Sequence, residues 1–220
     1  MPPATQRDDV SLLKIYETLH DHFGDLHWWP GDSPFEVIVG AILTQNTTWK
    51  NVEAAIRRLK AEDLLHPARL RPLTDLFLAD RIRSAGYHRV KTKRLKAFLH
   101  FLYQNYQDDL EVLFSEDLWI LREKLLLVHG IGEETADSIL LYAGGKPIFV
   151  VDAYTRRIMQ RHHIISDTAR YEDVQALFMA GLPRSAPLYN QYHALMVNTG
   201  KHFCRKQNPK CEICPLHAFL

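Results

Sequence analysis

Residues 127–161, LVHGIGEETADSILLYAGGKPIFVVDAYTRRIMQR, join a Gly-x-Gly turn between two helical patterns to an apolar run that ends at Asp152. Gly130 and Gly132 allow the backbone to turn tightly and to bring its N–H groups close to an anionic oxygen. The helix expected to start near Glu133 adds the positive end of its dipole at the same place. The stretch predicts a phosphate-binding turn followed at a fixed distance by a carboxylate; an ordinary helix–helix connection is the alternative.

Length and composition set the broad class of the protein. The chain has 220 residues, which suits one large domain or two small interleaved ones with a substantial core. Hydrophobic residues make up 46% and charged residues 24%, as in ordinary globular proteins. No apolar run approaches the roughly 20 residues of a membrane span, so we expect no membrane contact. The start MPPATQRDDV lacks the apolar core of a signal peptide, which predicts a cytoplasmic location.

The net charge of +1 does not by itself indicate a nucleic-acid-binding protein. The distribution of charge is more informative, because the segment 81–96 is basic and contains no acidic residue. Such a run can be a solvated helix face, or a second contact with a phosphate backbone beside the Gly-x-Gly turn. Its basic residues are Arg81, Arg83, Arg89, Lys91, Lys93, Arg94 and Lys96.

Apolar residues recur at helical spacing through nearly the whole chain, which predicts an all-α fold. Ser33, Pro34 and Glu36 form a capping box with proline at the first helical position, and they open the helix PFEVIVGAILTQ. The next helix, TWKNVEAAIRRLK, should bury its apolar face, including Trp49. Further helices are expected at 73–83, 88–106, 116–127, 133–144, 152–161, 171–181 and 187–203.

The quoted stretch resembles the helix-hairpin-helix plus Gly/Pro-Asp module of the endonuclease III superfamily of DNA glycosylases, with Pro147 and Asp152 in the Pro and Asp places. The resemblance implies a two-part helical fold. Residues 35–147 would form a barrel that contains the hairpin, and residues 1–34 would pack with 148–220, which end in a cysteine loop. The two modules would enclose a cleft with the hairpin and Asp152 at its mouth. The implied partner is double-stranded DNA with a damaged base, bound by a monomer at the nucleoid.

Asp152 has two interpretations. It precedes an expected helix, so its carboxylate can simply cap that helix. The resemblance implies a catalytic role instead, because cleavage of the glycosidic bond builds positive charge on the deoxyribose, and a fixed carboxylate stabilises that charge or orients the attacking water. The family flips the target nucleotide out of the duplex before this step.

Position 134 separates the activities within the superfamily. Members that also cleave the strand carry a Lys there, whose amine forms a Schiff base with the sugar. This chain has Glu134, which cannot form an imine, so we expect base removal by water without strand cleavage. Glu134 is a candidate for the catalytic site, or an acid that suits the start of a helix. Adenine glycosylases carry a glutamate four residues before a glutamine, and here that place is Ala41, four before Gln45.

An alkylated purine needs no such acid, because methylation already makes the base cationic and a good leaving group. The strings WWP, LTQNT, AGY followed by KTKRL, and HGIG followed by ADSILLYA resemble the 3-methyladenine glycosylase III branch over about residues 25–203. The resemblance places aromatic faces around the base, where they attract cations; burial in the core is the alternative. It further places Gln45 in the gap left by base flipping and Lys201 beside Asp152. Expected base-pocket residues are Trp28, Trp29, Pro30 and Trp49, and expected DNA contacts are Gln45, Asn46, His129, Gly130 and Gly132.

All three cysteines lie within eleven residues, as Cys204, Cys211 and Cys214. Their spacing resembles the first three ligands of the C-x6-C-x2-C-x5-C loop that holds a four-iron four-sulfur cluster in endonuclease III proteins. The fourth place is Leu220. We expect an iron–sulfur cluster, completed by a non-cysteine group such as His202 or His217, and no organic cofactor. An empty site and a zinc site with three cysteines and one histidine are the alternatives.

Two other functions fit parts of the pattern. An endonuclease III-like enzyme for oxidised or mismatched bases would share the hairpin, but the lysine at position 134 that marks it is absent. A non-catalytic DNA-binding protein would also keep the hairpin, yet it would not need the carboxylate of Asp152.

Overall fold

The computed structural model describes residues 11–29 and 31–220 and confirms the all-α prediction, with no strand in these residues. The chain divides into two compact units. The continuous unit spans Trp29–Lys146, and the discontinuous unit combines the chain up to Trp28 with Pro147–Leu220. The sequence had placed the boundaries at residues 34/35 and 147/148.

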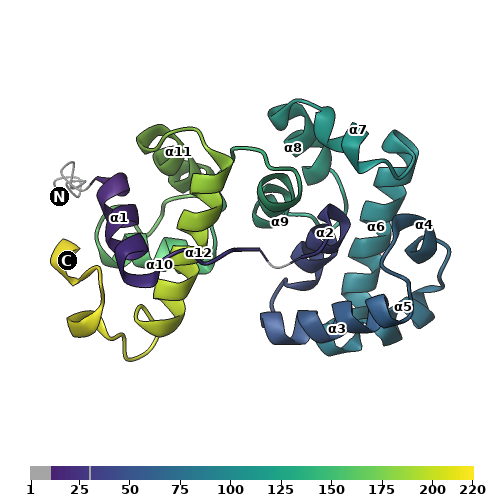
Figure 1. Ribbon diagram of the computed structural model, residues 1–220, viewed down its shortest axis with the longest axis horizontal. Coiled ribbons are helices and arrows are strands. Elements are labelled where there is room, and N and C mark those ends of the chain that lie inside the picture. The colour runs from purple at the N-terminus through teal and green to yellow at the C-terminus, as the bar shows by residue number, and fades with distance from the viewer. Residues whose placement is uncertain (1–10, 30) are drawn as a thin grey trace. The chain divides into compact units, whose positions relative to one another are not determined.

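The continuous unit is built around α2 (Pro34–Leu43), which is buried on nearly all sides. Ser33 caps it by accepting a hydrogen bond from the N–H of Glu36 at 3.2 Å, while Glu36 accepts one from the N–H of Asp32. Helices α3, α6 and α9 pack on α2 (Figure 1). The other elements are α3 (Trp49–Ala61), α4 (Pro67–Leu70), α5 (Asp75–Arg81), α6 (His88–Tyr106), α7 (Leu110–Ser115), α8 (Leu118–Leu126), α9 (Glu133–Ser138), a 3-10 turn at Arg83–Ala85 and a π-helical turn at Ile139–Ala143.

The discontinuous unit holds the apolar run that precedes Asp152. Residues 148–151 are buried and belong to no helix or strand, and Gln175 Nε2 donates to the carbonyl of Phe149 at 2.7 Å. The ring of Phe149 stacks on Phe178 with centroids 3.9 Å apart. Helix α1 packs against α11 and α12 and so completes the unit (Figure 1). Its helices are α1 (Leu12–Phe23), α10 (Ala153–Arg161), α11 (Tyr171–Gly181) and α12 (Ala186–His202), with short 3-10 turns at Cys211–Ile213 and His217–Phe219.

Several expected helix boundaries are wrong in informative ways. The helix that should run to Gln45 ends at Leu43, so Gln45 lies in the following turn. The helix expected at 133–144 is α-helical only to Ser138 and then widens into the π turn. Helix α1 was not predicted, although Ser11 stands at its N-cap position; the side chain of Ser11 makes no capping hydrogen bond. Helices α4 and α7 were missed because they are only four and six residues long.

The basic segment 81–96 is not one solvated face, contrary to that interpretation. Lys91 is buried, and its ammonium donates to the carbonyls of Leu43 and Ala85 at 2.8 and 2.7 Å. Lys96 likewise donates to two backbone carbonyls. Arg81 pairs with Glu62 at 2.8 Å. Of the basic residues in this segment, only Arg83, Arg89 and Lys93 are exposed.

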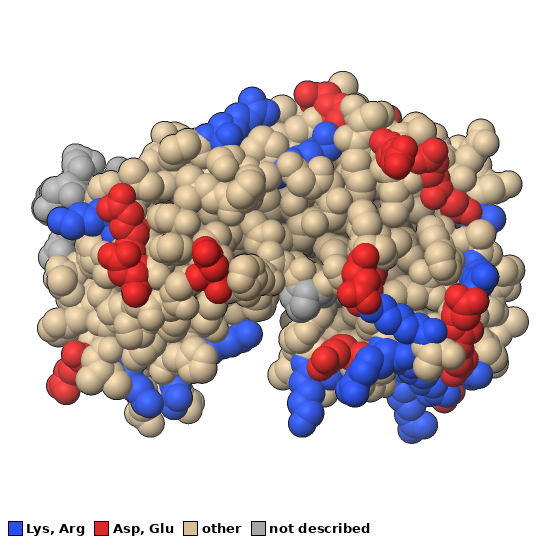
Figure 2. Space-filling model, viewed as in Figure 1, with Lys and Arg blue, Asp and Glu red and all other residues tan. Residues whose placement is uncertain are grey.

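Figure 2 shows lysine and arginine side chains gathered over α3 and α5, with acidic side chains among them. Arg58 pairs with Asp80 at 2.7 Å, and Lys60 with Asp32 at 2.7 Å. These partners neutralise much of the positive charge locally.

Among the described residues, none of the helices has the length and apolar character that a membrane span requires.

Candidate functional site

The Gly-x-Gly turn joins α8 to α9, and its two glycines differ in their steric surroundings. Gly130 has φ +83°, and an added Cβ would clash with the side chain of Arg94. Gly132 caps α9 in an extended conformation, and an added Cβ would meet no described atom within 4 Å. The fold therefore requires glycine at position 130. At position 132 the fold itself would accept a side chain, and glycine is required only if a ligand such as a phosphate approaches the backbone there.

Gln45 is tied to this hairpin. Its amide nitrogen donates to the carbonyl of Gly130 at 3.0 Å and to the hydroxyl of Thr135 at 2.9 Å. Arg94 on α6 donates to its carbonyl oxygen. The sequence indicated Arg94 only as one of seven basic residues in the segment 81–96, because only the fold brings it to the turn. The other two expected DNA contacts, Asn46 and His129, are exposed.

An aromatic cluster lies in the continuous unit. Trp29 meets Trp49 edge to face, with ring centroids 5.2 Å apart, and Tyr142 at 4.9 Å. Gly40 on α2 leaves room for both indoles, since a Cβ there would come within 3.3 Å of each. Tyr142 belongs to the π-helical turn and was not predicted; such turns frequently occur at functional sites. Of the four expected base-pocket residues, the structure brings Trp29 and Trp49 together.

Trp28 belongs to the other unit, where the ammonium of Lys201 lies 5.4 Å from the centre of its ring. This arrangement is a cation–π contact. The loop before Trp28 is held by Gln191 on α12, whose amide donates to the carbonyl of Gly24 at 2.8 Å and accepts from the N–H of Leu26 at 3.1 Å. Pro30 lies outside the described residues.

Asp152 is the N-cap of α10, and its two carboxylate oxygens face different groups. Oδ1 accepts a hydrogen bond from the N–H of Thr155 at 2.7 Å. Oδ2 lies 3.7 Å from Nε2 of His193 on α12. Both side chains are buried, and sequence reasoning missed His193 because it is 41 residues further along the chain.

The electrostatics around His193 connect it with two predicted site residues. Burial lowers the pKa of His193, the carboxylate of Asp152 opposes this shift, and the ammonium of Lys201 adds to it. His193 is therefore disposed to remain neutral beside Asp152. Lys201 itself is exposed, close enough to act on this pair through its charge.

Glu134 lies in the first turn of α9 and is exposed. Its position suits the helix dipole. The buried acid of this helix is Asp137, which accepts two hydrogen bonds from Arg122, at 2.7 and 3.2 Å, and joins α9 to α8. Ala41 is buried within α2.

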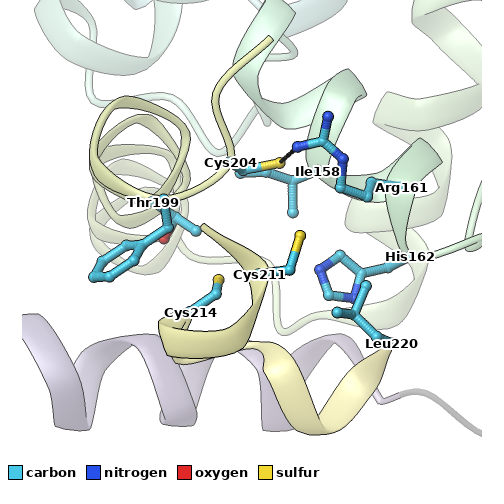
Figure 3. A pocket seen from close by; sticks show the side chains of 9 residues that line it. Ile158, Arg161, His162, Thr199, Cys204, Cys211, Cys214 and Leu220 are labelled. Atoms are coloured by element: carbon cyan, nitrogen blue, oxygen red, sulfur yellow. Dashed lines mark hydrogen bonds between the residues drawn. The ribbon is translucent and has the colours of Figure 1, made fainter. Parts of the chain in front are cut away.

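The three cysteines line one small cavity in the discontinuous unit, which is partly open to solvent (Figure 3). Cys204 is buried, and Cys211 and Cys214 are half-buried. Burial raises the pKa of the Cys214 thiol, and the neighbouring thiols raise it further. The remaining lining residues are Ile158, Arg161, His162, Thr199, Phe203 and Leu220.

Comparisons with known proteins identify the family and the fold. A family model described as HhH-GPD superfamily base excision DNA repair protein matches residues 39–184. A Methanocaldococcus jannaschii protein named "Putative DNA repair glycosylase" is 46% identical over 209 residues, which cover 94% of each chain. The structure of Helicobacter pylori 3-methyladenine DNA glycosylase bound to 1,N6-ethenoadenine matches with a TM-score of 0.76 and 27% identity, covering 87% of this chain and 98% of that one. An endonuclease III–DNA complex matches with a TM-score of 0.81 and 22% identity, covering 94% and 92%, and shows the shared fold.

Proposed function

This chain belongs to the HhH-GPD superfamily of base excision DNA repair proteins, and on that premise we propose that it is a monofunctional DNA glycosylase that removes alkylated purines such as 3-methyladenine. It would bind double-stranded DNA as a monomer, flip the damaged nucleotide and hydrolyse the N-glycosidic bond.

The observation that carries the proposal is the fixed carboxylate of Asp152. The hydrogen bond from Thr155 holds one oxygen, so the carboxylate keeps a defined orientation before DNA binds. A preorganised negative charge stabilises positive charge on the sugar without reorganisation in the transition state. In this mechanism the other oxygen, Oδ2 beside His193, contacts the attacking water or the deoxyribose.

The hairpin supports DNA binding in the proposed function. Gly132 is exposed, and the backbone N–H groups at the start of α9 carry a partial positive charge suited to a phosphate oxygen. The hydrogen bonds from Gln45 and Arg94 brace the turn. Release of Gln45 from this network would let it fill the space that the flipped nucleotide leaves.

Two observations support a cationic base as the substrate. Trp29, Trp49 and Tyr142 gather aromatic faces in one cluster, and such faces attract cations. The buried methyl group of Ala41 offers no proton for a neutral leaving group. An alkylated purine is attracted by the aromatic faces and needs no proton donor, because it is already cationic.

The substrate class can be tested with purified protein by identifying the bases it releases. Methylated genomic DNA should yield 3-methyladenine, while duplexes with hypoxanthine, thymine glycol or adenine opposite 8-oxoguanine should react slowly. Replacing Trp49 with Ala should cost roughly 1–3 kcal/mol of transition-state stabilisation on 3-methyladenine. Equal release of hypoxanthine or adenine would reject the cationic-base argument and make Glu134 a candidate general acid.

The absence of a lysine at position 134 leads to a separate test. Borohydride should trap no covalent protein–DNA adduct during base release, because neither Glu134 nor water forms an imine. The product should be an abasic strand that breaks only after alkali. Efficient trapping would reject the monofunctional mechanism and direct attention to Lys201 as the nucleophile.

A further inference from the structure

The cavity between α10, α12 and the C-terminal turns gathers sulfur and nitrogen donors from three parts of the chain. Cys204 follows α12, Cys211 and Cys214 flank a 3-10 turn, and His162 follows α10. This donor set suits iron or zinc. The family resemblance predicts a four-iron four-sulfur cluster here, but the chain supplies only three of its four cysteines.

A cluster and a single zinc ion make different demands on these side chains. A zinc ion draws its ligands to about 2.0–2.3 Å from one point. Within the described residues, no group of three or more His, Cys, Asp or Glu side chains is arranged to hold one metal ion. A cluster instead spreads its ligands, because each cysteine binds its own iron. Three thiols that line one cavity therefore suit a cluster, in which each thiolate binds its own iron.

The fourth ligand cannot be the side chain in the usual fourth place. Leu220 occupies that position and lines the cavity, but its side chain has no donor atom. The two histidines nearest the cysteines in the sequence, His202 and His217, are exposed, and neither lines the cavity. His162 does line it and is buried. Figure 3 shows its imidazole beside Cys211 and Leu220.

We propose that this cavity binds a four-iron four-sulfur cluster through Cys204, Cys211, Cys214 and His162, with the imidazole replacing the missing cysteine. Arg161, the residue before His162, donates a hydrogen bond to Cys204 Sγ at 3.0 Å. Hydrogen bonds to ligating sulfur and replacement of thiolate by imidazole both raise the reduction potential of a cluster. This assignment concerns the metal centre and does not depend on which base the protein removes.

The test is spectroscopic and uses the full chain, isolated anaerobically or reconstituted with ferrous iron and sulfide. The parent should be brown, with about four irons and four sulfides per chain. Pulsed electron paramagnetic resonance of the reduced protein should show a histidine nitrogen coupling, and labelling histidine with nitrogen-15 should change it. His162→Ala should lower the iron content or change the cluster type. His162→Cys should keep four irons and lose the nitrogen coupling.

Leu220→Cys supplies the matched control, because it restores a cysteine at the usual fourth place. Added to His162→Ala, it should return the iron content to the parent level without nitrogen coupling. Far-ultraviolet circular dichroism establishes that each variant is folded; if His162→Ala is not, His162→Cys and the parent spectrum still decide the matter. A His162→Ala protein with the parent iron content and spectrum would overturn the assignment of His162. Zinc, or no cluster even after reconstitution, would overturn the whole site.

Discussion

Asp152 caps α10 with one carboxylate oxygen and presents the other to His193, so its structural and proposed chemical roles can be separated. Asparagine keeps the size and the capping oxygen but removes the charge. We therefore expect Asp152→Asn to slow base release by at least about a hundredfold while DNA affinity changes only a few-fold. Single-turnover release and fluorescence-anisotropy binding measure the two effects. A parallel loss of binding and activity would make Asp152 structural.

His193 gives the discontinuous unit a pH dependence whose sign can be derived. Because burial holds the pKa of His193 below its ordinary value near 6.5, the unfolded chain binds more protons between those two values. The free energy of unfolding should therefore fall as pH drops below about 6.5. Urea unfolding at several pH values measures this, and His193→Gln should reduce the slope. An unchanged slope in that variant would show that another group causes it.

At the scale of one element, the hairpin predicts opposite outcomes for its two glycines. Gly130→Ala should destabilise the fold, because φ is positive and Arg94 fills the space. Gly132→Ala should leave thermal stability nearly unchanged, yet weaken binding to every duplex alike, since the methyl group meets only an approaching phosphate. Thermal unfolding and binding to two unrelated duplexes separate the effects. Normal affinity in a folded Gly132→Ala protein would exclude this turn as the phosphate contact.

At the scale of the whole molecule, the unit that contains Asp152 is completed by the N-terminal helix α1. Leu19 is fully buried in it, while Leu13 on the same helix is 40% exposed. Leu19→Ala should lower the free energy of unfolding by about 2–5 kcal/mol, a large share of the roughly 5–15 kcal/mol of a typical domain. Leu13→Ala is the matched control and should change it by under about 1 kcal/mol. Similar unfolding midpoints for both variants would contradict this packing.

The sequence by itself determined the features that depend on neighbouring residues. Helical periodicity and caps such as Ser33 predicted most helices, since both act within a few residues. The hairpin glycines, Asp152 as a helix cap and the cysteine spacing are likewise local patterns. Trp29 and Trp49 could be recognised as aromatic candidates from the sequence, but the contact between their rings depends on how α2 is packed.

Only the tertiary structure decided which distant residues meet these local features. Arg94 braces the hairpin from α6, and Tyr142 joins the tryptophans through a π turn that helical periodicity does not reveal. His193 reaches Asp152 from α12, and His162 reaches the cysteine cavity from α10. Packing between helices far apart in the sequence fixes each of these contacts. Propensity and spacing act over a few residues and contain no information about such packing.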